Sequence, residues 1–214
     1  MSQRRDLTLS IIAHKVGPVS TRSPPSGANP DNQPKALEAH VMATHNFANA
    51  PPLDILLVPG GSGNGALERE NDTAIADFIA ARYQELKFLL SVCTGAKHLA
   101  ISGVLDGRHA TTNKASWSIV VKHGRNVSWI PTARWTQDGN IWTSSGVSAG
   151  MDMTYAFLKQ LYGEEQAGSV MNGMEYAPHV DPDWDPFSIV WKVSSEETPA
   201  AARVRSHEWL AYMS

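Results

Sequence analysis

The sequence predicts an α/β fold in which helices cover both faces of a mostly parallel β-sheet. Short apolar runs alternate along the chain with segments of helical periodicity, an order typical of such folds. Residues 53–58 and 87–92 are almost continuously apolar, as expected for strands that are buried on both faces. Ligands of parallel sheets bind at the carboxyl ends of the strands. The residues that follow each strand are therefore candidates for a functional site.

The first half of the chain contains the runs that we expect to form the sheet. The clearest is the apolar run at residues 53–58, which ends at Pro59-Gly60-Gly61. A loop rich in Pro, Ser and Gly extends from Gly17 to about Pro34, and Asp72 or Thr73 can cap a helix that ends near Gln84. We place strands at residues 7–13, 39–43, 53–58 and 87–92, and the start of another helix at residues 96–101.

The second half continues the alternation. A strand is expected at residues 110–112 and a helix at residues 114–123. The turn residues Asp138-Gly139-Asn140 interrupt short apolar runs between residues 129 and 143, which is a hairpin signal. Further helices are expected at residues 147–162 and 164–176, followed by a packed extended tail. We expect all residues, 1–214, to form a single domain.

Composition excludes several functional classes. A chain that is 42% hydrophobic and 18% charged is typical of globular proteins, and a net charge of −3 gives no electrostatic basis for binding nucleic acid or an anionic membrane. One cysteine cannot form an internal disulfide, which favours a reducing compartment. The polar N-terminus lacks the apolar core of a signal peptide. We therefore expect a cytoplasmic protein.

Cys93 is placed where the expected strand at 87–92 turns directly into a helix. Such a turn exposes the side chain at the edge of the sheet and points helix N–H groups at it, which favours the nucleophilic thiolate. The alternative is a buried, inert cysteine, a frequent fate of unpaired thiols. The small neighbours Ser91 and Gly95 favour the sharp turn.

Four segments of the chain occur in a characteristic order. They are Leu56-Leu57-Val58-Pro59-Gly60-Gly61, Ser91-Val92-Cys93-Thr94-Gly95, Ala110-Thr111-Thr112 and Thr143-Ser144-Ser145-Gly146-Val147-Ser148-Ala149-Gly150-Met151-Asp152. Together they resemble the DJ-1/PfpI superfamily, in the branch that contains isonitrile hydratase. The resemblance covers roughly residues 7–175 and implies a flavodoxin-like three-layer sandwich, a homodimer and a cysteine on a nucleophile elbow.

The resemblance also exposes a gap at the N-terminus. Members of the superfamily begin with one more strand, followed by an acidic residue that meets the cysteine. Only six residues precede Leu7, so we expect the sequence as given to lack this strand and its carboxylate. The two explanations are a gene model that starts too late and a genuine short form of the domain.

The resemblance assigns roles to residues at the edge of the sheet. Cys93 is the expected nucleophile, and the N–H groups of Gly61 and Thr94, with the turn at Gly60, are an expected anion hole. For each assignment a structural alternative stays open: a tight turn at Gly60-Gly61, a helix cap at Thr94, core packing at Val147 and a polar loop position at His14. The Thr94 hydroxyl is also expected to contact an intermediate, and the expected pocket residues are Gly146, Val147 and His14.

No motif for a metal or cofactor is present. The chain lacks Cys-x-x-Cys, His-Glu-x-x-His and an EF-hand loop, and the Gly-rich run at 60–65 lacks the Gly-Lys-Ser/Thr of a phosphate loop. We therefore expect neither a metal nor a cofactor. His98 lies five residues beyond Cys93 and is expected to face away from it. Asp152, inside a helix, is expected to be structural.

Three functions follow from these residues and the resemblance. The first is a cofactor-free enzyme of the isonitrile hydratase type, which adds water to an organic isonitrile and releases an N-substituted formamide. The second is glyoxalase- or deglycase-like action on α-oxoaldehydes. The third is a non-catalytic redox sensor or scaffold, since an accessible thiolate oxidises readily. The first two require a small-molecule substrate, and the missing carboxylate leaves the choice between enzyme and non-enzyme open.

Overall fold

The computed structural model describes residues 7–21 and 39–193. Its main sheet has four strands in the order β5 (Ile55–Val58), β6 (Phe88–Val92), β10 (Ile141–Ser144) and β9 (Trp135–Asp138). Strands β5, β6 and β10 are parallel, and β9 returns antiparallel to β10. The predicted mostly parallel α/β sheet and the hairpin at residues 138–140 are confirmed.

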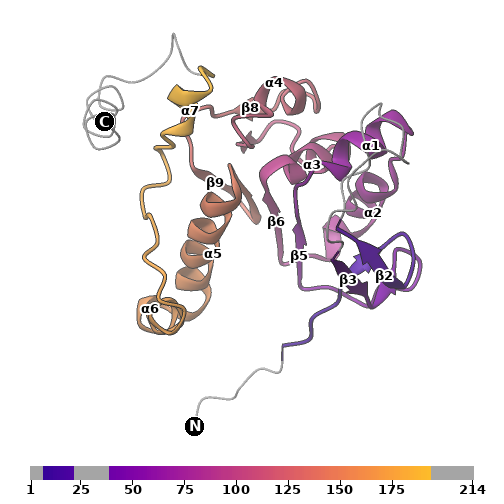
Figure 1. Ribbon diagram of the computed structural model, residues 1–214, viewed down its shortest axis with the longest axis horizontal. Helices are drawn as coiled ribbons and strands as arrows, with labels where there is room; N and C mark the ends of the chain where they lie inside the picture. The colour runs from indigo at the N-terminus through magenta and orange to yellow at the C-terminus, as the bar shows by residue number, and fades with distance from the viewer. Residues whose placement is uncertain (1–6, 22–38, 194–214) are drawn as a thin grey trace.

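Helices cover both faces of this sheet. Leu89 and Leu90 are neighbours on β6, yet they belong to different cores because successive strand residues point to opposite faces. Leu89 packs with Ile79 of α2 (Ala74–Arg82) and with Leu99 of α3 (Ala96–Ile101). Leu90 packs with Met153 and Phe157 of α5 (Val147–Tyr162). Figure 1 shows α5 on one side of β6 and β5 and α2 and α3 on the other, the layering of a flavodoxin-like sandwich.

The N-terminal strands form two small sheets apart from the main one. β1 (Ile12–Ala13) pairs with β4 (His45–Asn46), and β2 (Gly17–Ser20) pairs with β3 (His40–Ala43). Within the described ranges, β5 is an edge strand of the main sheet and pairs with β6 alone.

Two expectations about the N-terminal region are wrong in detail. The strand expected at residues 7–13 is confined to its last two residues, because only this part pairs with β4. The expected loop from residue 17 begins instead as β2, which pairs with β3. The remainder of that loop, residues 22–38, lies outside the described part of the chain.

The helix expected at residues 114–123 is reduced to α4 (Trp117–Val120). Lys114 is drawn into the protein instead, where its ammonium group donates to Thr111 Oγ1 at 2.6 Å and to the Ala133 carbonyl at 2.8 Å. Burial lowers the pKa of Lys114 to about 7.

The remaining elements are α1 (Gly63–Arg69), β7 (His109–Ala110), β8 (Ser128–Trp129), α6 (Glu164–Gly173), α7 (Phe187–Val190) and the 3-10 turns Tyr83–Glu85 and Cys93–Gly95.

The tail after α6 is fixed to the domain through Asp152. This buried carboxylate on α5 accepts from Arg134 Nε at 2.6 Å, from the Tyr176 hydroxyl at 2.5 Å and from the His179 backbone N–H at 2.8 Å. Its contacts are those of a structural residue. None of the helices in the described part of the chain is long and apolar enough to cross a membrane.

Candidate active site

Cys93 has a backbone conformation that few residues other than glycine adopt. Its φ is 59°, and it begins the 3-10 turn between β6 and α3. A positive φ costs a side-chain-bearing residue energy, and strained residues of this kind cluster at functional sites. The strand–turn–helix geometry is that of a nucleophile elbow. The residue is half-buried, and it forms no disulfide.

The strand register brings three chain segments together beside this cysteine. Val58 at the end of β5 pairs with Ser91, and Ser144 at the end of β10 pairs with Val92. The turn that follows β5 and the loop that follows β10 therefore leave the sheet on either side of Cys93. They carry Gly60 and Gly61 on one side and Gly146 and Val147 on the other.

Close approach of two backbones explains two of the glycines. An ideal Cβ on Gly60 would lie 2.7 Å from Cys93 Cβ and 2.7 Å from the Thr94 backbone nitrogen. An ideal Cβ on Gly95 would lie 2.2 Å from the carbonyl oxygen of Val58. Gly61 differs, because its φ of 150° meets the turn requirement noted from the sequence. The need for glycine at residue 95 comes from packing across the sheet, which the sequence does not reveal.

The hydroxyl of Thr94 is the centre of a hydrogen-bond network. Its Oγ1 accepts from the Gly61 N–H at 3.0 Å and from Asn64 Nδ2 at 2.9 Å. The Gly61 N–H expected in an anion hole is therefore already engaged, and a bound anion would have to displace Thr94 Oγ1 from it. On the other side, Thr112 Oγ1 donates to the carbonyl of Cys93 at 2.9 Å and holds the elbow in place.

His98 belongs to this network through Asn64, although none of its described hydrogen bonds reaches Cys93. The buried His98 Nε2 lies 3.0 Å from Asn64 Oδ1, so His98 reaches Thr94 through one amide. Burial lowers the pKa of His98 to about 4, with the charge of Lys97 acting in the same direction. Asn64 lies in the run Gly63-Asn64-Gly65, which sequence analysis considered only as a phosphate loop.

The buried His98 predicts a loss of stability in acid. Its pKa is about 4 in the folded protein and near its ordinary value of 6.5 in the unfolded chain, so between these values only the unfolded chain binds the proton. Stability present above pH 6.5 is therefore lost as the pH falls toward 4, by up to about 3 kcal/mol. Urea unfolding at pH 7 and pH 4.5 should show a smaller acid loss for His98→Gln than for wild type. Equal losses would contradict the assignment.

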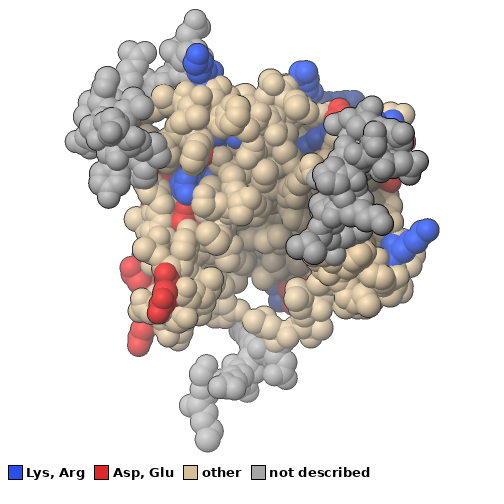
Figure 2. Space-filling model, viewed as in Figure 1, with Lys and Arg blue, Asp and Glu red and all other residues tan. Residues whose placement is uncertain are grey.

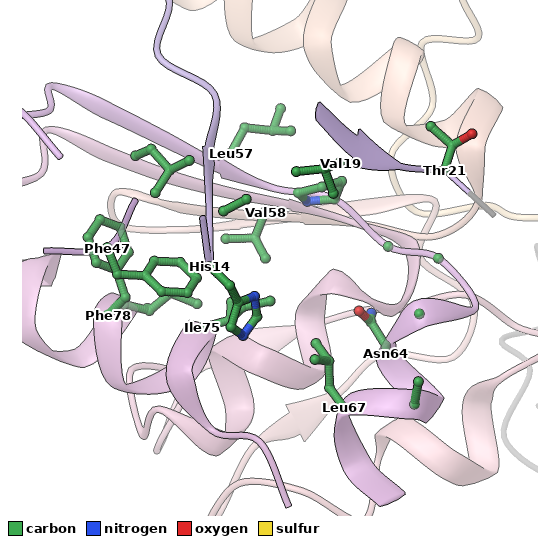
Figure 3. Close-up of a pocket in the computed structure, with 18 of the residues that line it drawn as sticks. His14, Val19, Thr21, Phe47, Leu57, Val58, Asn64, Leu67, Ile75 and Phe78 are labelled. Atoms are coloured by element: carbon green, nitrogen blue, oxygen red, sulfur yellow. The ribbon is translucent and has the colours of Figure 1, made fainter. Parts of the chain in front are cut away.

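A cavity of about 650 Å³ opens beside the turn at Gly60 and Gly61. Its walls are largely apolar and include Phe47, Leu57 and Phe78, and Figure 3 shows Asn64 and Leu67 on the side away from Phe47. His14 also lines it, stacked edge-on against Phe47 at 5.1 Å, with its Nε2 2.8 Å from Asp72 Oδ2.

Gly146 and Val147 line a different, smaller cavity of about 260 Å³ on the β10 side. The structure thus does not bring His14 and Val147 to one pocket. Val147 is 76% exposed, so core packing, the alternative considered for it, is wrong. Among the residues that the structure describes, no group of three or more His, Cys, Asp or Glu side chains could hold a metal ion.

Cys93 has a strained backbone and lies on a strand–turn–helix elbow at the carboxyl edge of a parallel sheet. These features place the chain among the α/β proteins that carry a cysteine at such an elbow. Within this class the chain belongs to the DJ-1/PfpI family, whose model matches residues 27–160.

Similar proteins agree with this membership. Isonitrile hydratase of Pseudomonas putida is 33% identical over 163 residues, which cover 73% of this chain and 69% of the hydratase. A ThiJ/PfpI family protein of Pseudomonas syringae superposes with a TM-score of 0.64 at 25% identity, covering 96% of this chain and 74% of that protein. The HTH-type transcriptional regulator GbdR of Pseudomonas aeruginosa is 31% identical over 123 residues, which cover 57% of this chain and only 32% of the regulator.

Proposed function

We propose that this protein is a cofactor-free enzyme that hydrates organic isonitriles, with Cys93 as the nucleophile. The observation that carries the proposal is the positive-φ cysteine at the carboxyl edge of the sheet, in a chain 33% identical to an isonitrile hydratase. The proposed substrate is a small organic molecule. The apolar cavity beside the turn at Gly60 and Gly61 suits the organic substituent of an isonitrile.

The proposed reaction balances with water as the second reactant. The Cys93 thiolate forms a bond to the terminal carbon of the isonitrile, and that carbon takes a proton from solvent, giving a thioimidate. Water then adds to the same carbon and the carbon–sulfur bond breaks. The N-substituted formamide leaves, and the thiol is regenerated.

Thr94 is the proposed partner of Cys93 in this sequence of steps. Its hydroxyl adjoins the nucleophile in the chain and is held by Gly61 and Asn64. The proposal assigns it a hydrogen bond to the nitrogen of the thioimidate, and assigns the backbone N–H of Thr94 to the charge that develops during attack, because the Gly61 N–H is held by Thr94 Oγ1. The pocket residue on this side is His14, while Gly146 and Val147 line the separate cavity on the β10 side.

A substrate comparison tests the reaction class. The purified protein is incubated separately with cyclohexyl isonitrile and with methylglyoxal, and each reaction is followed by proton NMR. The expected result is N-cyclohexylformamide from the first and no enzyme-dependent loss of the second. Consumption of methylglyoxal alone would replace the proposal by glyoxalase- or deglycase-like action.

Turnover of neither compound would favour a non-catalytic role. The similarity to a segment of the regulator GbdR supports such a role as the second candidate, because that protein's name describes regulation and not catalysis. In that case Cys93 would act as a redox-sensing thiol, or the domain would act as a scaffold.

We also propose a cytoplasmic homodimer. Exposed apolar side chains from α5 and the tail, Val147, Phe187 and Trp191, border the same small cavity and would be covered by a second copy. On the face seen in Figure 2, Lys and Arg side chains are scattered and form no continuous patch, which supports a small-molecule substrate over nucleic acid. The mass of the protein in solution, measured by light scattering, tests the dimer; a monomer would contradict it.

A further inference from the structure

A chain of hydrogen bonds leads from the buried His98 to the residue after the nucleophile. His98 Nε2 contacts Asn64 Oδ1 at 3.0 Å, and Asn64 Nδ2 donates to Thr94 Oγ1 at 2.9 Å. The three side chains come from different places in the fold: α3, α1 and the elbow turn. Asn64 also lines the 650 Å³ cavity, so the chain connects the interior to the proposed substrate pocket.

The chemistry of these groups fixes the direction of the chain. An amide oxygen only accepts, so His98 must carry its proton on Nε2 to bond Asn64 Oδ1. Neutral His98 meets this requirement in one tautomer, and its burial keeps it neutral. With its oxygen held by His98, the Asn64 amide presents its N–H to Thr94.

Thr94 is thereby left with one hydrogen-bonding function that is only weakly used, its own proton. Its oxygen accepts from both Asn64 and the Gly61 N–H. Its own proton has the Gly61 carbonyl as an acceptor only at the long distance of 3.4 Å. A hydroxyl that accepts two hydrogen bonds and donates a weak one is prepared to donate to a ligand.

We propose that Asn64 and His98 are positioning residues that hold Thr94 as a hydrogen-bond donor toward the group bound to Cys93. This inference rests on the proposed function for the identity of that group, but the direction of the hydrogen bonds is a property of the free protein. According to this proposal, Asn64 acts through the N–H that its amide donates to Thr94, and not through the shape of its side chain.

Asn64→Asp is the sharpest test because it keeps the shape and removes the donor. A carboxylate at residue 64 would accept a hydrogen bond from the Thr94 hydroxyl, which could then no longer donate to the group bound to Cys93. We therefore expect kcat for isonitrile hydration to fall by about a hundredfold, the cost of one lost donor at a reacting centre, with little change in KM. Thr94→Val should lose a similar factor, and the double variant should lose no more than Thr94→Val alone. Asn172→Asp adds the same charge on the exposed surface of α6 and should keep the wild-type rate. Additive losses, or a wild-type rate for Asn64→Asp, would overturn the proposal.

His98 supplies a matched pair of variants. His98→Gln retains an N–H donor for Asn64 Oδ1 and should keep kcat within about threefold of the wild-type value. His98→Leu leaves the Asn64 amide free to rotate, so its kcat should fall by most of the factor expected for Asn64→Asp. Equal rates for the two variants would show that His98 only fills space and would overturn its role.

A spectroscopic measurement separates this inference from the proposed function. Nitrogen-15 NMR of the histidine rings at pH 7 should show His98 as the neutral Nε2–H tautomer in wild type, whether or not isonitriles are turned over. The Nδ1–H tautomer would reverse every bond in the chain and overturn the inference. If the protein lacked hydratase activity but showed the Nε2–H tautomer, the proposed reaction would be refuted, while the direction of the hydrogen bonds from His98 to Thr94 would be supported.

Discussion

Replacing Cys93 by serine is expected to lower the rate of isonitrile hydration about a thousandfold or more. The serine hydroxyl takes the position of the thiol on the elbow, so the geometry of the turn at φ 59° is kept. A hydroxyl is ionised far less than a thiol at neutral pH, so the serine is a much poorer nucleophile. Initial rates of formamide release from cyclohexyl isonitrile measure the loss.

Met174→Ser is the matched control for this substitution. It places the same side chain on an exposed residue beyond α6, where the wild-type rate is expected. Unfolding by urea should show similar stability for the two variants. If Cys93→Ser kept more than a tenth of the wild-type rate, the nucleophile would have to be sought elsewhere.

Gly95→Ala is expected to destabilise the protein by about 3 kcal/mol or more. The new Cβ would lie 2.2 Å from the Val58 carbonyl oxygen and 3.0 Å from that of Pro59, and neither is a side chain that can rotate away. The elbow and the end of β5 must therefore move apart, which would also displace Gly60 from Cys93. The midpoint of urea unfolding at pH 7 measures this loss.

Gly168→Ala is the control because it makes the same change where nothing lies within 4 Å of the new Cβ. Gly168 is inside α6, so alanine should leave stability unchanged or raise it by up to about 1 kcal/mol through its higher helix propensity. A Gly95→Ala variant as stable as Gly168→Ala would show that the elbow and β5 are not packed as described.

The features that the sequence could predict depend on local pattern. Continuous apolar runs end at turn residues, and the strands β5 and β6 and the helix α5 lie where this pattern places them. The elbow at Cys93 was predictable for the same reason, since a buried strand runs directly into a helix with small residues on either side. A local pattern also predicts which edge of a parallel sheet carries the site.

The features that it could not predict depend on contacts between distant segments. The link from His98 to Thr94 is one of them, because it passes through Asn64 of α1, whose Oδ1 lies 3.0 Å from His98 Nε2. Gly95 is required by a carbonyl on a neighbouring strand. Lys114 ends up buried because Thr111 and Ala133 satisfy its ammonium group, which shortens the expected helix. The separation of the pocket residues into two cavities likewise follows only from three-dimensional packing.

The most direct test of the central claim, that Cys93 bonds covalently to the substrate, is intact-protein mass spectrometry during turnover. Wild-type protein is mixed with cyclohexyl isonitrile, the reaction is quenched in acid within milliseconds, and the mass of the intact protein is measured. Because the chain has one cysteine, the account predicts a single adduct of one isonitrile that maps to Cys93 and is absent from Cys93→Ser. Formamide production by a protein that never carries this adduct, or an adduct that forms and is not hydrolysed, would contradict the account.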